Sequence, residues 1–148
     1  EMYQATHRYV DEVDIAIFSA AVSDFKPKVV SSEKIKKSKE AGESMTLELI
    51  RTKDILASVG KIKKDGQFLV GFALETENEL ENARTKMGEK NLDMIVLNSL
   101  RDKGAGFKSD TNKISILVSD GRVIDFELKV KEEVAEDIFN EIIKNIHA

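Results

Sequence analysis

Residues Phe68–Leu74, FLVGFAL, form an unbroken apolar run of strand length. Such a run is typical of a strand that is covered on both faces, as in a parallel sheet. Two comparable runs, at residues 13–20 and at Met94–Leu97, lie on either side of it along the chain. The three runs predict the central strands of one sheet.

Amphipathic helices are predicted between these strands. One helix has Asp54 as its N-cap, carries Val59 and Ile62 at helical spacing, and ends at Gly66. A second amphipathic segment spans residues 78–90, and the opening of the chain predicts the end of another helix before the first strand. Alternation of strands and helices favours right-handed βαβ units and a parallel sheet.

The end of the chain has a different pattern. Residues 113–119 and 122–129 alternate with period two around Asp120-Gly121, which predicts an antiparallel hairpin. A final helix is indicated by an apolar stripe at Val134, Ile138, Ile142 and Ile146. The sequence therefore predicts one α/β domain over residues 1–148. Its fold is Rossmann-like and three-layered, with a mostly parallel central sheet closed by a C-terminal antiparallel hairpin.

Composition excludes several classes of protein. The 148 residues hold 23 Lys plus Arg against 27 Asp plus Glu, a net charge of −4, and no Cys. A disulfide framework and a thiolate metal site are therefore excluded. The acidic balance argues against nucleic acid, and no apolar run approaches the ~20 residues of a membrane span. We expect a cytoplasmic protein without membrane contact. His7 and His147 lack metal-ligand spacing and are expected at the surface, so metal ligands remain unknown.

Ligands of open α/β sheets bind outside the carboxyl ends of the strands. Three segments are expected there: the loop Ala20–Lys39, the turn Gly71–Thr76, and the turn after Asn98. The loop sets one acid, Glu33, against several lysines: Lys26, Lys28, Lys34, Lys36, Lys37 and Lys39. Such a loop can close on a polyphosphate. The alternative is a solvated surface loop.

Four single residues suit the same site, each with an alternative. Asp24 can accept a hydrogen bond from a base amino group or a sugar hydroxyl, or it can cap a loop. Lys86 and Lys90 lie ~40° apart on their helix and can lean toward a cleft, or they can complement the helix dipole. Phe72 offers an aromatic wall to a planar base, or it belongs to the core. Dinucleotide and P-loop phosphate fingerprints are absent from the sequence.

An ordered set of motifs along nearly the whole chain resembles the phosphopantothenate-cysteine ligase family. In many bacteria that enzyme is the C-terminal half of a bifunctional coenzyme A biosynthesis protein. The Lys-x-Lys-Lys motif within residues 33–37 contributes most to the resemblance. The matching segments are residues 19–27, 33–37, 47–49, 52–56, 70–76 and 83–98, followed by Gly106-Phe107, Asp110 and Asn112.

The resemblance implies a reaction and a set of site residues. With Mg²⁺, CTP as co-substrate would activate the carboxylate of 4′-phosphopantothenate as an acyl-cytidylate, and the amine of cysteine would then displace CMP. From a flap, Lys34 would be the catalytic residue that stabilises the charged intermediate. The implied nucleotide-binding residues are Phe18, Ser19, Ala20 and Asp24 at the base and sugar, Lys53, Asp54, Ile55 and Leu56 along the pocket, Phe72 near the base, Lys34, and Lys86 with Lys90 at the phosphates.

The resemblance also implies partners and a missing segment. The family is dimeric, and the hairpin at residues 113–129 is the expected pairing surface of a homodimer. A glycine-rich first strand and an Asn that acts on the acyl-cytidylate should precede Glu1, so the chain is expected to be an N-terminally truncated ligase domain. A fused phosphopantothenoylcysteine decarboxylase domain would carry FMN. The alternatives are a nucleotide-binding fragment without catalysis, an ATP-using relative, or an unrelated nucleotide-binding domain.

Overall fold

The computed structural model describes residues 1–36, 44–99 and 109–147. The chain divides into two compact units. We call them the sheet unit, Glu1–Ser19 with Ile55–Ala148, and the lysine-rich unit, Ala20–Asp54.

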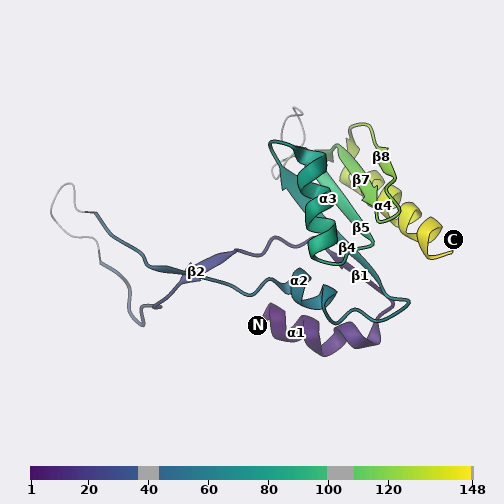
Figure 1. The fold of residues 1–148 in the computed structure, drawn as a ribbon. Coiled ribbons are helices and arrows are strands. Elements are labelled where there is room, and N and C mark those ends of the chain that lie inside the picture. Colours follow the sequence, from purple (N-terminus) through teal and green to yellow (C-terminus); the bar gives the residue numbers. More distant parts are fainter. Residues whose placement is uncertain (37–43, 100–108, 148) are drawn as a thin grey trace. The chain divides into compact units, whose positions relative to one another are not determined.

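Helices and strands alternate between residues 55 and 99, and consecutive strands precede and follow that stretch (Figure 1). In chain order they are α1 (Met2–Tyr9), the 3-10 helix η1 (Val10–Glu12), β1 (Ile15–Phe18), β2 (Phe25–Pro27), β3 (Leu49–Arg51), α2 (Ile55–Gly60), β4 (Phe68–Glu75), α3 (Glu79–Glu89), β5 (Met94–Ser99), β6 (Thr111–Asn112), β7 (Ile114–Val118), β8 (Val123–Asp125), β9 (Lys129–Val130) and α4 (Lys131–Ile146).

The sheet unit is built on a five-stranded sheet with the order β1-β4-β5-β7-β8. The strands β1, β4 and β5 run parallel, while β7 and β8 are antiparallel to their neighbours. The α/β fold predicted from the sequence, with parallel core strands closed by a hairpin, is confirmed. A second pair, β6 with β9, was not predicted, because two residues per strand are too few to show a period.

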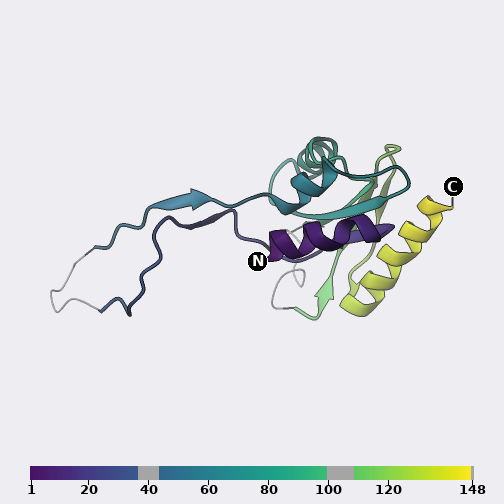
Figure 2. The ribbon, with the colours of Figure 1, turned by 90° about the horizontal axis from the view of Figure 1, so that it is seen from below.

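The central strand β4 explains why its sequence is apolar throughout. Phe68 and Val70 pack into the cluster that includes the buried residues of α4, whereas Leu69 and Ala73 pack into the cluster that includes α2 and α3. Figure 2 shows α2 and α3 on one side of the sheet and α4 on the other. Full burial of one large aliphatic side chain stabilises the fold by about 1.5–3 kcal/mol. Both helix layers are therefore needed to cover this strand.

The final helix, α4, presents the predicted apolar stripe to the sheet. Val134, Ile138 and Ile142 are buried. Ile146 is 39% exposed, so the buried stripe ends one turn earlier than the spacing predicts. The reason is that Ile146 borders a polar hollow at this end of the sheet instead of the core.

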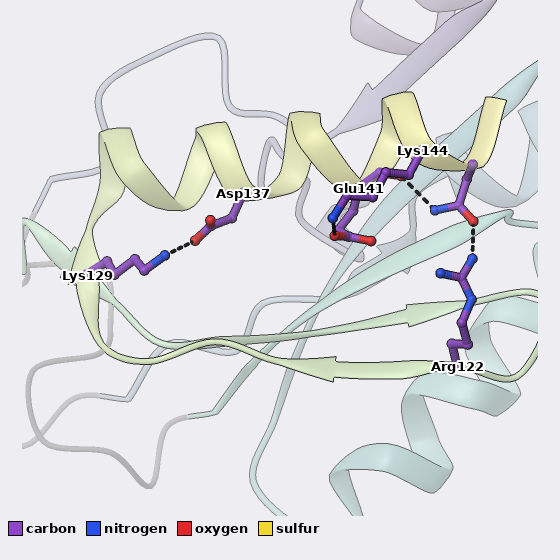
Figure 3. Close-up of polar contacts among 6 residues, drawn as sticks. Arg122, Lys129, Asp137, Glu141 and Lys144 are labelled. Carbon is purple, nitrogen blue, oxygen red and sulfur yellow. Dashed lines mark hydrogen bonds and ion pairs between the residues drawn. The ribbon is translucent and has the colours of Figure 1, made fainter. Parts of the chain in front are cut away.

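Polar contacts hold α4 in place as well (Figure 3). They join Lys129 on β9 to Asp137, and Arg122 to Asn145, while Lys144 pairs with Glu141 within α4 itself. The Lys129 Nζ donates to Asp137 Oδ2 at 2.7 Å, and this hydrogen bond holds the pKa of Lys129 above its usual range. It ties the short strand β9 to the second turn of the helix that follows it.

The helix α2 is shorter than predicted. It ends at Gly60, not at Gly66, and Ile62 lies outside it with 46% exposure. The cause is a tertiary contact: the Asn91 side chain donates to the carbonyl of Gly60 at 3.0 Å, and the main chain of Lys90 lies against Gly60. Gly66 has a φ of 85° and forms part of the turn before β4.

The lysine-rich unit contains an antiparallel pair, β2 with β3. The sequence predicted a loop where β2 lies, and a half-buried strand at Met45–Ile50. The observed strand begins at Leu49, and Met45, Leu47 and Leu49 are all more than half exposed. The prediction of half burial is wrong because period-two alternation shows which side chains share a face. It does not show whether another layer covers that face.

Candidate functional site

The three parallel strands direct their carboxyl ends toward the same end of the sheet, where β4 and β5 extend beyond the end of β1. Phe18, the last residue of β1, pairs with Gly71 on β4, and Leu74 near the end of β4 pairs with Asn98 on β5. This edge of an open α/β sheet is where ligands bind. The site expected from the sequence therefore has its scaffold in the sheet unit.

One group of predicted nucleotide residues gathers on the face that α2 and α3 cover. Phe18 and Leu56 are partly buried in the same apolar cluster, and Ile55 beside them is 7% exposed. Gly71 permits this packing, because a Cβ there would stand 2.9 Å from Leu56 Cδ2 and 2.7 Å from a terminal methyl of Leu92. The start of α2 is thus set against the strand end that the prediction names. Ser19 follows Phe18 and is exposed.

Phe72 lies on the opposite face. It is half buried and packs against the cluster that contains Val70, Val96 and the buried residues of α4. The structure therefore does not bring Phe72 together with Phe18 and Leu56. Its predicted place near the base stays a prediction.

A charged group closes the carboxyl end of β4. The Lys86 Nζ on α3 donates to Glu75 Oε1, and the Asn82 side chain donates to Glu75 Oε2 at 3.3 Å. The Glu75 side chain is 12% exposed and that of Lys86 is 44% exposed. A buried carboxylate thus holds a partly solvated ammonium at the edge where a ligand would bind.

Lys90 stands one residue beyond α3, as its C-cap. Its main-chain N–H donates to the carbonyl of Lys86 at 3.1 Å, and its side chain is half buried. A Cβ on Gly60 would come within 1.9 Å of the Lys90 carbonyl oxygen. The position of Lys90 therefore depends on the absence of a side chain at residue 60.

Asparagines meet at the end of β5. Asn112 Nδ2 donates to Asn98 Oδ1 at 2.7 Å, and Asn112 Oδ1 accepts from the main-chain N–H of Lys113. The sequence placed the turn after Asn98 at the site but gave no role to Asn98 itself. A polar residue at the end of an apolar strand was the available signal.

In the lysine-rich unit, main-chain contacts fix the segment that carries Asp24. The Thr52 N–H donates to the carbonyl of Asp24 at 2.9 Å, and the Thr52 hydroxyl donates to the carbonyl of Ser23 at 2.5 Å. The Asp24 side chain is exposed. This segment thus presents a carboxylate to solvent on a held main chain, which suits either the recognition role or the loop-cap role.

The other predicted residues of this unit are exposed: Ala20, Lys34, Lys53 and Asp54. The Ser31 hydroxyl donates to the carbonyl of Glu33 at 2.6 Å, which forms a turn directly before Lys34. Lys37 and Lys39 of the predicted lysine run lie outside the described residues, as do Gly104, Gly106 and Phe107. The full Lys-x-Lys-Lys motif is therefore not seen, although Lys34 and Lys36 are.

Metal ligands do not cluster in the described ranges, where no three His, Cys, Asp or Glu side chains could hold an ion together. His147 is exposed as expected, but His7 is half buried and stacks on Tyr3 at 4.2 Å between ring centroids. The expectation of a surface His7 is wrong because α1 carries Tyr3 one turn before it. None of the helices formed by described residues is long and apolar enough to cross a membrane.

A polar hollow of about 640 Å³ lies at the opposite edge of the sheet. Its cations are already paired: Lys63 with Asp93, Lys64 with Asp11, and Arg122 with Asp120. The backbone and side chain of Arg122 both donate to Asp120, which lowers the pKa of that carboxyl group below its usual range. The ion pairs of the hollow stabilise this end of the sheet and already occupy its cations. The carboxyl edge therefore remains the candidate site.

Comparison with known proteins identifies relatives of the whole described fold. A family profile described as "DNA/pantothenate metabolism flavoprotein C-terminal domain" matches residues 1–146. A crystal structure of the C-terminal domain of coenzyme A biosynthesis bifunctional protein CoaBC is 38% identical, with a TM-score of 0.75. The match covers 99% of this chain and 63% of that one.

Two curated proteins are similar over nearly the full chain. Coenzyme A biosynthesis bifunctional protein CoaBC of Bacillus subtilis (strain 168) is 45% identical over 142 residues, which cover 96% of this chain and 34% of that protein. A protein named cysteine/cysteine sulfinic acid decarboxylase, from an unknown prokaryotic organism, is 51% identical over 147 residues. These residues cover 99% of this chain and 40% of that protein. The chain thus spans between a third and two fifths of these two relatives.

Proposed function

The chain belongs to the family of the DNA/pantothenate metabolism flavoprotein C-terminal domain, and from that premise we propose that it is the ligase domain of a coenzyme A biosynthesis enzyme. The family predicted from the sequence is confirmed by this match and by the CoaBC relatives. The observation that carries the proposal is the match over residues 1–146, which includes the whole carboxyl edge of the sheet.

The proposed reaction joins 4′-phosphopantothenate to cysteine in two steps. In the first, a carboxylate oxygen of phosphopantothenate attacks the α-phosphorus of CTP, which forms the acyl-cytidylate and releases pyrophosphate. In the second, the cysteine nitrogen attacks the activated carbonyl carbon, an amide forms, the amine loses a proton, and CMP leaves. The protein's task is to hold a polyanion and to stabilise charge as it develops.

We assign the basic residues to the phosphates, and Asp24 with the apolar residues to the base and sugar. Lys86 and Lys90 would meet the phosphates, because ammonium groups are strong partners for phosphate oxygens. Asp24 and the segment from Phe18 through Ser19 to Ala20 would read the base and sugar. The other contacts would come from Lys53, Asp54, Ile55 and Leu56 at the start of α2, and from Phe72. Mg²⁺ bound by phosphate oxygens would neutralise further charge.

Lys34 is the residue we assign to the activated intermediate. It is exposed, and it lies beyond a turn in which Ser31 bonds the carbonyl of Glu33. An exposed ammonium can meet an anion that arrives from solvent. If the Lys34 ammonium moved from water to the surface of a bound acyl-cytidylate, its attraction to that anion would become stronger, because the local dielectric constant is lower there.

Further parts of the proposal concern the whole protein. We place it in the cytoplasm as a homodimer, with the hairpin at residues 113–129 as the pairing surface. A linked phosphopantothenoylcysteine decarboxylase domain would bind FMN, in keeping with the bifunctional name of the CoaBC relatives. An ATP-using enzyme is the second candidate, since few contacts decide the choice of base. A domain that only binds the nucleotide is the third.

Product formation tests the proposal. The chain is assayed alone and with the segment that precedes the matching region of Bacillus subtilis CoaBC fused before Glu1. Phosphopantothenate, cysteine, nucleotide and Mg²⁺ are supplied, and the amide is measured by mass spectrometry. We expect CTP-dependent product from the fused protein, and no product without Mg²⁺. ATP-dependent product would favour the second candidate, and nucleotide binding without product would favour the third.

A further inference from the structure

Glu75 has no part in the proposed reaction, yet two side chains of α3 hold its carboxylate at the carboxyl edge. Both carboxylate oxygens accept from α3: Oε1 from the Lys86 Nζ, and Oε2 from the Asn82 side chain. Asn82 and Lys86 are four residues apart and so share one face of the helix. The Asn82 amide also donates to the carbonyl of Glu77 at 2.9 Å. One face of α3 is thereby fastened to the end of β4.

The burial of the two partners is unequal. The Glu75 side chain is 12% exposed, whereas that of Lys86 is 44% exposed. The carboxylate is thus held by the protein, and the ammonium at its tip still reaches solvent. A free lysine side chain samples many rotamers and loses that freedom when it binds an anion. An ammonium that is already fixed loses less.

We propose that Glu75 is a positioning residue that holds the Lys86 ammonium at the carboxyl edge of β4, ready to meet a nucleotide phosphate. The inference rests on the proposed function, because that function is what puts phosphate beside Lys86. Lys86 keeps its contact with Glu75 and adds a phosphate oxygen through another of its three N–H donors. The phosphate therefore finds an ammonium whose place is set in advance.

Two effects of the carboxylate oppose each other. It repels the phosphate, and it reduces the ordering that Lys86 must undergo. Repulsion is screened where the ammonium and the phosphate meet water, since Lys86 is nearly half exposed. The loss of side-chain freedom is not screened by water. It is therefore the larger effect, and the carboxylate favours nucleotide binding overall. Loss of the carboxylate charge is therefore expected to weaken nucleotide binding.

The pairing itself is tested without nucleotide. Lysines are acetylated at limiting reagent, and modification of Lys86 is measured by peptide mass spectrometry relative to the exposed Lys61. Glu75→Gln keeps the shape of the side chain but weakens the ion pair, and we expect Lys86 to react about threefold faster. Glu77→Gln, an exposed carboxylate two residues along, is the matched control and should change nothing. An unchanged Lys86 rate in Glu75→Gln, at unchanged melting temperature, would overturn the inference.

The role toward phosphate is tested with CTP and Mg²⁺ in the same assay. CTP is expected to protect Lys86, and half-protection should need about threefold more CTP in Glu75→Gln than in the unmodified sequence or in Glu77→Gln. Tighter CTP binding in Glu75→Gln would overturn the positioning role. Faster acetylation in Glu75→Gln, with no protection by CTP in any variant, would instead place the failure in the proposed function of Lys86.

Discussion

Replacing Lys34 by Gln is expected to lower amide formation by about 10²- to 10³-fold while leaving CTP affinity within about threefold. The reason is that the charge on Lys34 would be used only when the acyl-cytidylate is present. Single-turnover measurements of pyrophosphate and amide in the fused protein described above check this. Pyrophosphate should appear without a matching amount of amide, because the activated intermediate is trapped.

Lys36→Gln is the control for this variant. Lys36 is also exposed in the same unit and lies two residues farther along, so its loss removes the same charge from the same segment. We expect its amide formation to remain within about threefold of the unmodified rate, because stabilisation of the charged intermediate is assigned to Lys34 and not to Lys36. Equal losses in both variants would show a general effect of charge, and normal amide formation in Lys34→Gln would remove its catalytic role.

The substitution Gly60→Ala is expected to destabilise the sheet unit strongly. A Cβ at this position would lie 1.9 Å from the carbonyl oxygen of Lys90 and 2.8 Å from the carbonyl carbon. Both atoms belong to the main chain, so no side-chain rotation relieves the overlap, and α2 must move away from the end of α3. We expect a loss of about 3 kcal/mol in the free energy of unfolding, or ~10 °C in melting temperature.

Gly88→Ala provides the matched control, because Gly88 also lies in a helix and a Cβ there would meet no atom within 4 Å. Alanine favours helix over glycine by about 1 kcal/mol, so this variant should melt at or above the temperature of the unmodified chain. Thermal unfolding followed by circular dichroism measures both. If Gly60→Ala melted as high as Gly88→Ala, the close approach of α2 to Lys90 would be refuted.

Much of the fold was readable from the sequence because it depends on local pattern. The run Phe68–Leu74 became β4, and the alternation around Asp120-Gly121 became β7 and β8. Side-chain periods of 2 and 3.6 residues show which side chains share a face, and a two-residue turn fixes the hairpin register. These features need no knowledge of distant contacts.

What the sequence could not show depends on pairs that are distant along the chain. The helix α2 ends where Gly60 contacts Lys90 and Asn91. Hydrophobic periodicity does not predict these contacts. The bond between Glu75 and Lys86 likewise exists only once α3 is packed on β4. A carboxylate at a strand end, followed by a helix that carries Lys86, was the available local signal.

The roles of the candidate site residues stay predictions. Phe18 and Leu56 were expected together and pack in the same apolar cluster, because both belong to apolar strand and helix ends. Phe72 lies on the other face of the sheet, as any residue one step along a strand from Gly71 must. The function of these residues was predicted from the resemblance, since their packing alone is equally typical of a core.

Calorimetric titration of the 148-residue chain with CTP and with ATP, each with Mg²⁺, tests whether this chain recognises the cytosine base. The chain carries the residues to which we assign recognition of the base, so CTP should bind at least about tenfold more tightly than ATP. Asp24→Ala should abolish that binding, and Asp65→Ala, at the opposite edge of the sheet, should not. The absence of CTP binding, or equal CTP affinity in Asp24→Ala and the unmodified chain, would refute base recognition by Asp24.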